Sequence, residues 1–277
     1  MGLRIATNVA SQSVQKNLKQ INNESNTSLE RLSSGKRVSK ASDDAAGLAI
    51  ATKLDAQTKG LRQATRNAND GISMIQTAEG GLNETSNILI RLRELSVQAA
   101  SDTVGEQERG FLNKEYQQLT AEIDRIADST VFNGTPLLNG KGEKEMDFQV
   151  GAFAGEQNKI TFSAGDTNAS TSAIGVSGSG ITEKADARSS IESIDKAIEM
   201  VAGQRANLGA LQSRLGSTIR NLDVQATNQD NARSVIQDVD VAEATAQMAS
   251  NQVMKNAAVS TLSQANGIPT AALRLIG

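Results

Sequence analysis

The sequence contains no histidine, no cysteine and no tryptophan, and only two prolines. Without histidine and cysteine the chain lacks the commonest metal ligands, the imidazole general base, the thiol nucleophile and any disulfide. These absences exclude most hydrolase mechanisms, so we expect no enzyme, no catalytic residue, no metal site and no cofactor. The low aromatic content of 2% and the scarcity of proline favour long helices over a compact enzyme core.

The sequence also lacks an excess of positive charge and any long hydrophobic run. Its formal net charge of -3 gives no basic surplus for holding a nucleic acid. No stretch of about 20 apolar residues is present, so membrane insertion is not expected. Residues 1–20 have no continuous apolar segment followed by a small-residue cleavage site. The sequence therefore predicts a soluble protein without a cleavable secretory signal peptide.

What the sequence has in abundance is helical periodicity. Apolar residues recur three and four positions apart from Ile191 to Ile236, without an intervening proline. At about 1.5 Å per residue this helix would be on the order of 70 Å long, so its apolar stripe must pack against another long helix. Residues 75–99 supply a second stripe and residues 112–126 a shorter third one. The predicted fold class is mainly α: a long antiparallel coiled-coil helix bundle with a small β-hairpin region.

Local signals bound the helices of the first half. Gly35 is expected to close a first helix. Ser42, Asp43 and Asp44 are expected to begin a second one, because a hydroxyl caps a helix and carboxylates are favoured near its positive end. Capping explains the two aspartates better than a metal or acid–base pair, since the sequence offers no further ligands. The helical pattern then runs from residue 45 to about residue 99.

Gly60, Gly71, Gly80 and Gly81 lie inside the helix expected at 45–99. Each costs about 1 kcal/mol of helix stability relative to alanine unless close packing compensates. We therefore expect tight contacts on this helix.

After Phe132 the period of the apolar residues changes from 3.6 to 2. This alternation, with a glycine-containing connection, predicts a small hairpin formed by Met146, Phe148 and Val150 on one side and Ile160 and Phe162 on the other. The stretch 163–182 is rich in glycine, serine, threonine and alanine and is expected to be a flexible surface loop. Ser189, with Glu192 three residues later, has the form of a capping box at the start of the long helix.

One pair of residues has the spacing of a catalytic motif. Ser13 and Lys16 match the Ser-x-x-Lys spacing of an acyl-enzyme site. The partner motifs of such enzymes are missing, and no pocket-sized core surrounds the pair. We interpret both residues as part of the polar face of a helix.

Both ends of the chain carry weak apolar stripes. Between residues 1 and 34 the apolar positions are sparse and separated by Asn, Gln, Ser and Lys, and residues 236–276 are rich in small side chains. A lone helix of this kind is marginal in water. We expect these two segments to become ordered only when they share a core with other chains.

Several longer motifs stand near the two ends. The first half carries ERLSSGKRVSKASDDAAGLAI at 30–50, RNANDGISMIQTAEGGLNE at 66–84, IRLRELSVQAAS at 90–101 and EIDRIADSTVFNG at 122–134. The second half carries NLGALQSRL at 207–215, NARSVIQDVDVAEATAQM at 231–248 and LSQANGIPTAALRLIG at 262–277. In this order they closely resemble the two terminal regions of bacterial flagellin, and the resemblance covers nearly the whole chain apart from its middle.

The resemblance implies a structural subunit of the flagellar filament, used for swimming. Such a subunit is secreted through the flagellar export channel without a cleavable signal peptide and polymerises outside the cell beneath a filament cap. The implied partners are other copies of the chain in a helical homopolymer, an export chaperone, and the filament cap and junction proteins.

The resemblance also implies a division into domains. Residues 1–44 and 235–277 would form the helical core of the filament tube, and residues 45–234 a rod domain of long helices with the hairpin. The family's outer domains are inserted where this chain has only the loop 163–182, so we expect a thin, smooth filament. Candidate residues for assembly of the tube core are Leu18, Ile21, Leu29, Leu32, Val253, Val259, Leu262, Leu273, Leu275 and Ile276.

A second implied activity is recognition by the flagellin-sensing Toll-like receptor. Arg91, Leu95 and Gln98, with Glu115 on the facing helix, match the family's contact motif, although Ile90 replaces a polar residue common just before it. The alternative is that all four residues serve filament packing, because Leu95 also lies near the apolar stripe.

Three functions from different classes are compatible with the sequence. The first is a structural polymer. The second is a minor flagellin-like protein of the hook–filament junction, a class that usually lacks the unbroken central motifs present here. The third is a secreted coiled-coil enzyme or effector, which would need a nucleophile or metal site that the residue inventory does not offer.

Overall fold

The computed structural model describes residues 7–141 and 145–273, with 268–273 described by their backbone alone. The chain forms two compact units. The larger one comprises residues 57–227, and the other joins residues 1–56 to residues 228–277. Mainly helical structure with short β-hairpins confirms the predicted fold class.

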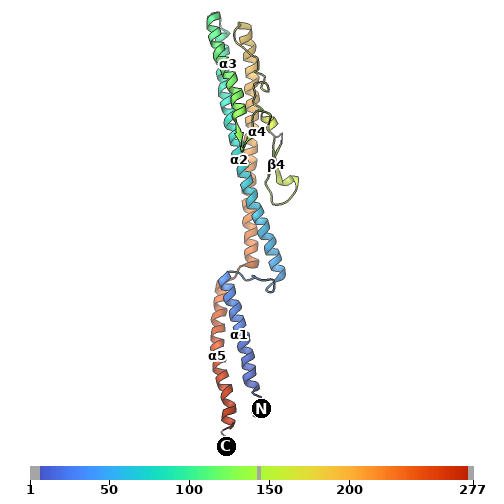
Figure 1. Ribbon diagram of the computed structural model, residues 1–277, viewed down its shortest axis with the longest axis vertical. Coiled ribbons are helices and arrows are strands. Elements are labelled where there is room, and N and C mark those ends of the chain that lie inside the picture. The colour runs from blue at the N-terminus through green and yellow to red at the C-terminus, as the bar shows by residue number, and fades with distance from the viewer. Residues whose placement is uncertain (1–6, 142–144, 274–277) are drawn as a thin grey trace. The chain divides into compact units, whose positions relative to one another are not determined.

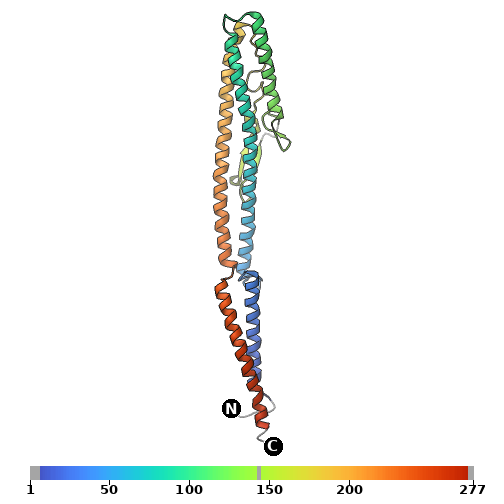
Figure 2. The ribbon, with the colours of Figure 1, turned by 90° about the vertical axis from the view of Figure 1, so that its left-hand side faces the viewer.

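The larger unit is built on one whole helix and on the greater parts of two others. The whole helix is α3 (Glu106–Ser129), and the other two are α2 (Ala45–Ala99) and α4 (Lys184–Gln237). Both ribbon views show α2 and α4 running side by side within this unit, with α3 returning along α2 (Figures 1 and 2). Along their described lengths, helices α2 and α4 contain no proline and no residue with a positive φ in their interiors, both of which break helices. Both helices therefore continue for many turns.

The three predicted apolar stripes form the helical part of the core of this unit. Every residue predicted on the stripe of α2 is buried: Ile75, Ala78, Leu82, Thr85, Leu89, Leu92, Ser96 and Ala99. Tyr116 and Ile123 are buried on α3, and Ile194, Val201, Leu208, Leu215 and Leu222 on α4. The three- and four-residue spacing placed these side chains on one face of each helix, where packing removes them from water.

Two antiparallel hairpins join α3 to α4. Strands β1 (Val131–Phe132) and β2 (Thr135–Pro136) form one, and β3 (Met146–Gln149) and β4 (Lys159–Phe162) form the other. The second hairpin confirms the predicted alternation, with Phe148 opposite Ile160. The first was not predicted, although its turn residues Asn133 and Gly134 both have the positive φ that an Asn-Gly turn provides.

The glycines of α2 receive these hairpin segments. A Cβ atom at Gly71 would lie 3.3 Å from the ring of Phe148, and one at Gly81 would lie 2.6 Å from Cδ1 of Leu138. At Gly80 a Cβ atom would meet nothing within 4 Å. The expected tight contacts are therefore present at some of the glycines, and they are made with the hairpin region.

The expectation of a flexible surface loop at 163–182 needs correction. The segment contains the short 3-10 helix η2 (Ala164–Thr167) and packs into the core of the larger unit. Its apolar and hydroxyl side chains fill space beside α3 and α4. The low-complexity composition gave no sign of this packing. The buried residues are Ala164, Thr167, Ala169, Thr171, Ile174, Val176 and Ile181.

The start of α4 also differs from the prediction. The helix begins at Lys184, so Ser189 lies inside it and donates from Oγ to the carbonyl of Asp186 at 2.9 Å. The capping-box interpretation of Ser189 is wrong. The earlier start is favoured because Ala187 and Ser190 are buried and Ser190 donates to the carbonyl of Gly180 at 2.9 Å.

The other unit is organised around two antiparallel helices, α1 (Val9–Ser34) and α5 (Val241–Leu273). Gly35 ends α1 in the left-handed conformation, as predicted. Asp44 caps the start of α2 by accepting from the backbone N–H of Gly47 at 2.8 Å, which confirms the predicted start. Asp43 does not cap this helix but accepts from the backbone N–H groups of Ser39 and Lys40 in the preceding loop. Asp240 caps α5 in the same way through the N–H groups of Ala242 and Glu243.

Candidate assembly and receptor surfaces

Polar contacts fix the register of α1 against α5. At one end, Asn8 donates from Nδ2 to the carbonyl of Ala265 at 2.8 Å, and Ser11 donates from Oγ to Oδ1 of Asn266 at 2.9 Å. At the other end, Lys36 and Asp238 form an isolated antiparallel bridge. These contacts span 200 or more residues of sequence, so they align two segments that the sequence keeps far apart.

The pair buries very few side chains along its length. Among the described side chains, α1 buries Ser11, and α5 buries Ala244, Asn251 and Ala265. The Nδ2 atom of Asn251 is buried without a hydrogen-bond partner. The two helices therefore share an interior that is small and partly polar, which contributes little hydrophobic stabilisation.

The assembly candidates divide into two groups. Leu18, Ile21, Leu32 and Leu262 are half-buried on the faces that α1 and α5 present to each other. Leu29, Val253 and Val259 point outward and are 56%, 69% and 51% exposed. The side chain of Leu273 and both Leu275 and Ile276 lie outside the described residues.

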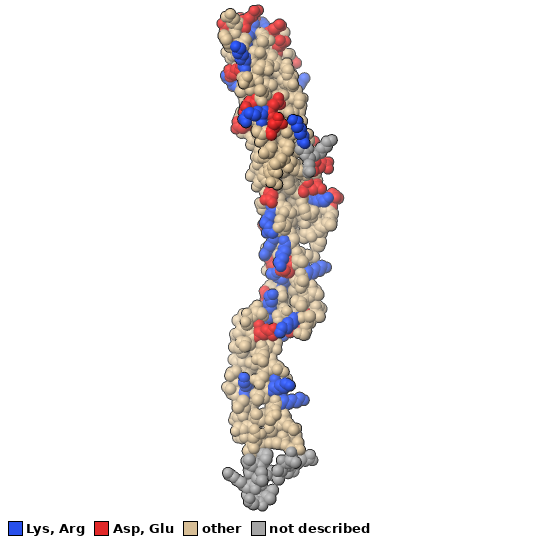
Figure 3. Space-filling view, in the orientation of Figure 1, with Lys and Arg blue, Asp and Glu red and all other residues tan. Residues whose placement is uncertain are grey.

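Helix α5, which carries Val253 and Val259, has few charged residues: between 241 and 267 they are Glu243 and Lys255. Val9, Val241 and Met254 are also exposed on α1 and α5. In the space-filling view, the visible face of this unit is mostly uncharged, with only scattered lysines, arginines and carboxylates (Figure 3). Exposed aliphatic side chains on a weakly charged surface are typical of a contact with another protein.

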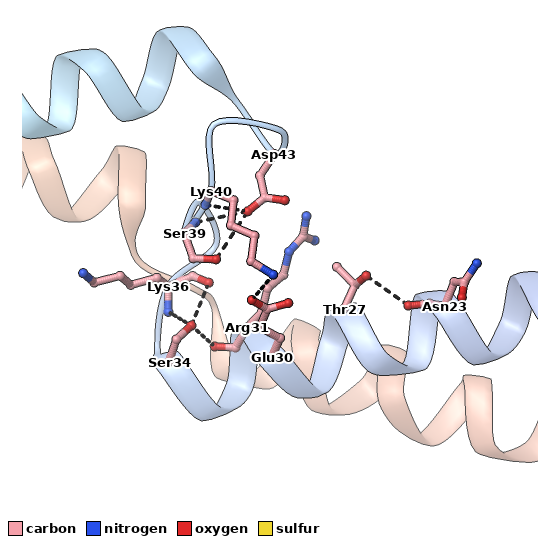
Figure 4. A network of polar contacts seen from close by, with 9 residues as sticks. All are labelled: Asn23, Thr27, Glu30, Arg31, Ser34, Lys36, Ser39, Lys40 and Asp43. Carbon is pink, nitrogen blue, oxygen red and sulfur yellow. Dashed lines mark hydrogen bonds and ion pairs between the residues drawn. The ribbon is translucent and has the colours of Figure 1, made fainter.

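A polar network holds the loop between α1 and α2. The carboxylate of Asp43 accepts from the backbone N–H groups of Ser39 and Lys40 at 3.2 and 3.0 Å, and Lys40 forms an ion pair with Glu30 at 2.5 Å (Figure 4). The two backbone donors lower the pKa of Asp43, since they stabilise its charged form. The hydrogen bond to Glu30 raises the pKa of Lys40.

Three of the four receptor candidates lie on the surface of the larger unit. Arg91 donates from Nε and Nη2 to Oε1 of Glu115, at 3.0 and 2.8 Å, and also pairs with Glu94 at 3.0 Å. The hydrogen bond to Glu115 raises the pKa of Arg91 more than the one to Glu94. Gln98 is exposed one helical turn beyond Glu94. The structure therefore brings Arg91 and Glu115 together across α2 and α3.

The fourth candidate, Leu95, is not available as a surface contact residue, so its prediction as one is wrong. Its side chain is 0% exposed, because it lies between Leu92 and Ala99 on the buried stripe of α2. It supports the surface from below and is not part of it. The exposed apolar side chains near it are Ile90 and Val97, each 49% exposed. Their exposure could have been predicted from the sequence, because neither Ile90 nor Val97 falls on the apolar stripe of α2.

Neither metal-ligating side chains nor the Ser13–Lys16 pair forms a buried cluster in the described residues. No group of three or more carboxylates is placed to hold a metal ion in this part of the chain. Ser13 and Lys16 both lie exposed on α1, as their interpretation as polar-face residues requires. None of the helices in the described part of the chain has the length and hydrophobicity that a membrane span needs.

Comparisons with known proteins agree on one family. Residues 5–143 match the bacterial flagellin N-terminal helical region, and residues 191–276 match the bacterial flagellin C-terminal helical region. Flagellin of Halalkalibacterium halodurans is 43% identical over 92% of both chains. Flagellin of Bacillus subtilis is 37% identical over 99% of this chain and all of its own.

Solved structures support the same conclusion. The crystal structure of Bacillus cereus flagellin is 31% identical and covers 61% of this chain and 94% of its own, with a TM-score of 0.51. A putative flagellar hook-associated protein from Vibrio parahaemolyticus shares the fold, with a TM-score of 0.59, but is only 16% identical over 70% of this chain and 99% of its own. The higher identities are with flagellins, so the junction-protein alternative is not favoured. The chain belongs to the bacterial flagellin family, whose members are structural subunits of the flagellar filament.

Proposed function

We propose that this chain polymerises through the outer faces of α1 and α5. The observation that carries the proposal is the exposure of Leu29, Val253 and Val259 on helices that bury almost nothing between them. Contact with neighbouring subunits would remove this aliphatic surface from water and add the core that the pair lacks. Leu18, Ile21, Leu32 and Leu262 would hold the pair itself together.

The proposed domains follow from this role. Residues 1–44 and 235–277 form the core of the filament tube, and residues 45–234 form the rod domain. Because the packed segment 163–182 stands where longer family members insert outer domains, the filament is thin and smooth. An image reconstruction with large radial projections made of this chain would contradict the absence of outer domains.

Electron microscopy tests the assembly directly. We expect the purified full-length chain to grow from added filament fragments, and a chain truncated after Gln237 to give no growth. The double substitution Val253→Ser and Val259→Ser keeps both helices but removes aliphatic surface, so it should prevent or strongly retard growth. Val224→Ser is the matched control, because Val224 is an exposed valine of the larger unit. Equal growth of the double variant and the control would contradict the proposal.

The proposed route to the filament is the flagellar export channel, without a cleavable signal peptide. The extracellular filament is the family's site of action, and an export chaperone, a filament cap and junction proteins are the proposed partners. Mass spectrometry of subunits recovered from filaments tests the route. Retention of the encoded amino-terminal segment is expected, and its proteolytic loss as a leader would contradict the proposal.

We also propose that the surface around Arg91, Gln98 and Glu115 binds the flagellin-sensing Toll-like receptor. Its support is the ion pair that fixes Arg91 beside Glu115 on adjacent helices. Alanine at Arg91 or Glu115 should reduce the response of receptor-bearing cells to purified monomer. Arg125→Ala is the control, because Arg125 is an exposed arginine of α3 that forms an ion pair with Glu122. No response to the unchanged chain would refute the proposal.

A further inference from the structure

One end of the α1–α5 pair contains a chemically labile dipeptide. Asparagine is thermolabile, and it is most so before glycine, which has no side chain to hinder ring closure. Asn-Gly occurs at Asn133–Gly134, Asn139–Gly140 and Asn266–Gly267. The first two lie in turns or loops, where Gly134 and Gly140 have positive φ. The third lies within α5, at the contact with α1.

The structure protects Asn266 in two ways. Its Oδ1 accepts from Oγ of Ser11 at 2.9 Å, and the adjacent carbonyl of Ala265 accepts from Nδ2 of Asn8 at 2.8 Å. The contact with Ser11 holds the carboxamide of Asn266 against α1, and the contact with Asn8 holds the backbone just before it. In addition, Gly267 lies inside a helix, where each backbone N–H donates to the carbonyl four residues earlier. Ring closure requires the backbone at Asn266 to leave this conformation.

We propose that Asn266 is a site of spontaneous deamidation that is protected while α1 and α5 are paired and becomes reactive when they separate. The backbone nitrogen of Gly267 loses its proton and attacks Cγ of Asn266. A Gly267 N–Cγ bond forms, the Cγ–Nδ2 bond breaks, and the leaving nitrogen takes up a proton from water, equivalent to the one that Gly267 lost, and departs as ammonia. Water then opens the five-membered imide at either carbonyl. No oxidation or reduction occurs.

The two products differ in their effect on the pair. Opening at Cγ gives aspartate, whose carboxylate can still accept the hydrogen bond from Ser11. Opening at the backbone carbonyl gives isoaspartate, in which Cβ and Cγ of the side chain enter the main chain. The additional backbone atom breaks the helical repeat of α5 next to Asn8 and Ser11. Subunits that remain unpaired therefore accumulate a form that pairs poorly.

The test uses the full-length chain in mildly alkaline buffer, in urea, as native subunits and as filaments. Peptide mass spectrometry follows conversion of Asn266 with time, and hydrogen exchange measures protection of α5 in the same samples. We expect conversion in samples with a protected α5 to be at least about tenfold slower than in urea, because reaction requires local opening. Equal conversion rates would overturn the inference.

Substitutions in α1 test the contact itself. Ser11→Ala removes the donor to Asn266 and should raise conversion in a protected sample, whereas Ser13→Ala on the exposed face should not. Equal rates in the two variants would overturn the role of the contact. A chain whose α5 is unprotected in every native sample would overturn the inference too, since the pair is its premise. A protected α5 without filaments would contradict the proposed assembly alone.

Gly267→Ala is the chemical control. A Cβ atom at Gly267 would meet nothing within 4 Å, so alanine fits the helix, and it should favour the helical conformation. The added methyl group hinders ring closure, and we expect conversion of Asn266 in urea to fall strongly while Asn139 converts as before. An unchanged rate at Asn266 would show that the reaction does not pass through the Gly267 nitrogen.

Discussion

Leu95 and Ile90 show how the face of a helix on which an aliphatic residue lies decides its role. Leu95 lies on the buried stripe of α2, and Ile90 lies on its exposed face. Both belong to the segment whose motif suggested receptor contact. A loss of receptor response on substitution of Ile90 would indicate a lost surface contact. The same loss on substitution of Leu95 would indicate a disturbed core.

We predict that Leu95→Ala lowers the free energy of unfolding of the larger unit by about 2–5 kcal/mol, because it leaves a cavity in a close-packed core. Ile90→Ala should change it by no more than about 0.5 kcal/mol, since the side chain is half exposed. Denaturant unfolding followed by circular dichroism measures both. Similar small effects for the two substitutions would contradict the burial of Leu95.

At the scale of single elements, α2 serves as the platform for the hairpin region. Gly71 and Gly81 leave room for Phe148 and Leu138, whereas Gly80 faces open space. The adjacent glycines Gly80 and Gly81 therefore allow a matched comparison within one helix turn.

Gly81→Ala is expected to destabilise the larger unit, because its Cβ would lie 2.6 Å from Cδ1 of Leu138 and 2.7 Å from Oγ1 of Thr130. Overpacking of this kind costs about 1–3 kcal/mol. Gly80→Ala should instead stabilise the helix, by up to about 1 kcal/mol, since alanine is the better helix former. Thermal unfolding measures the two shifts, and shifts of the same sign would contradict the packing described.

The loop between α1 and α2 should respond to acid. The folded pKa of Asp43 lies below its usual value of 3.8, because the backbone N–H groups of Lys40 and Ser39 donate to the carboxylate. A lowered folded pKa means that the stabilisation is fully present above the unfolded pKa and is lost as the pH falls through the folded pKa. We therefore expect the amide resonances of Ser39 and Lys40 to change with a midpoint below pH 3.8.

Asp43→Asn is the control for this titration. The amide oxygen still accepts a hydrogen bond but carries no charge, so the transition at Ser39 and Lys40 should disappear. Arg31 lies near enough to contribute a small favourable charge to Asp43, and its substitution by Gln should raise the midpoint. A midpoint that is the same in all three chains would show that another group titrates.

At the scale of the whole molecule, the two units differ in how much apolar surface they bury. The larger unit has a continuous core that draws on α2, α3, α4 and both hairpins. The α1–α5 pair buries small and polar side chains instead. Local stability follows buried apolar contact, so it should differ between the units.

We predict that hydrogen exchange in the isolated subunit gives strong protection within residues 75–99 and 191–222 and weak protection in α1 and α5. Assembly should then raise protection of α1 and α5 far more than that of the larger unit, because only they gain a new core. Measurements on subunits and filaments make the comparison. Uniform strong protection of the isolated subunit from α1 to α5 would contradict the proposed dependence on neighbours.

The sequence alone determined the stripes of α2, α3 and α4, the end of α1 at Gly35 and the start of α2 after Asp44, because periodicity and capping are local. It also carried the family resemblance. Only the tertiary structure decided that 163–182 packs into the core and that Leu95 is buried while Arg91 meets Glu115. Those outcomes depend on contacts between distant segments, whose packing overrides local composition.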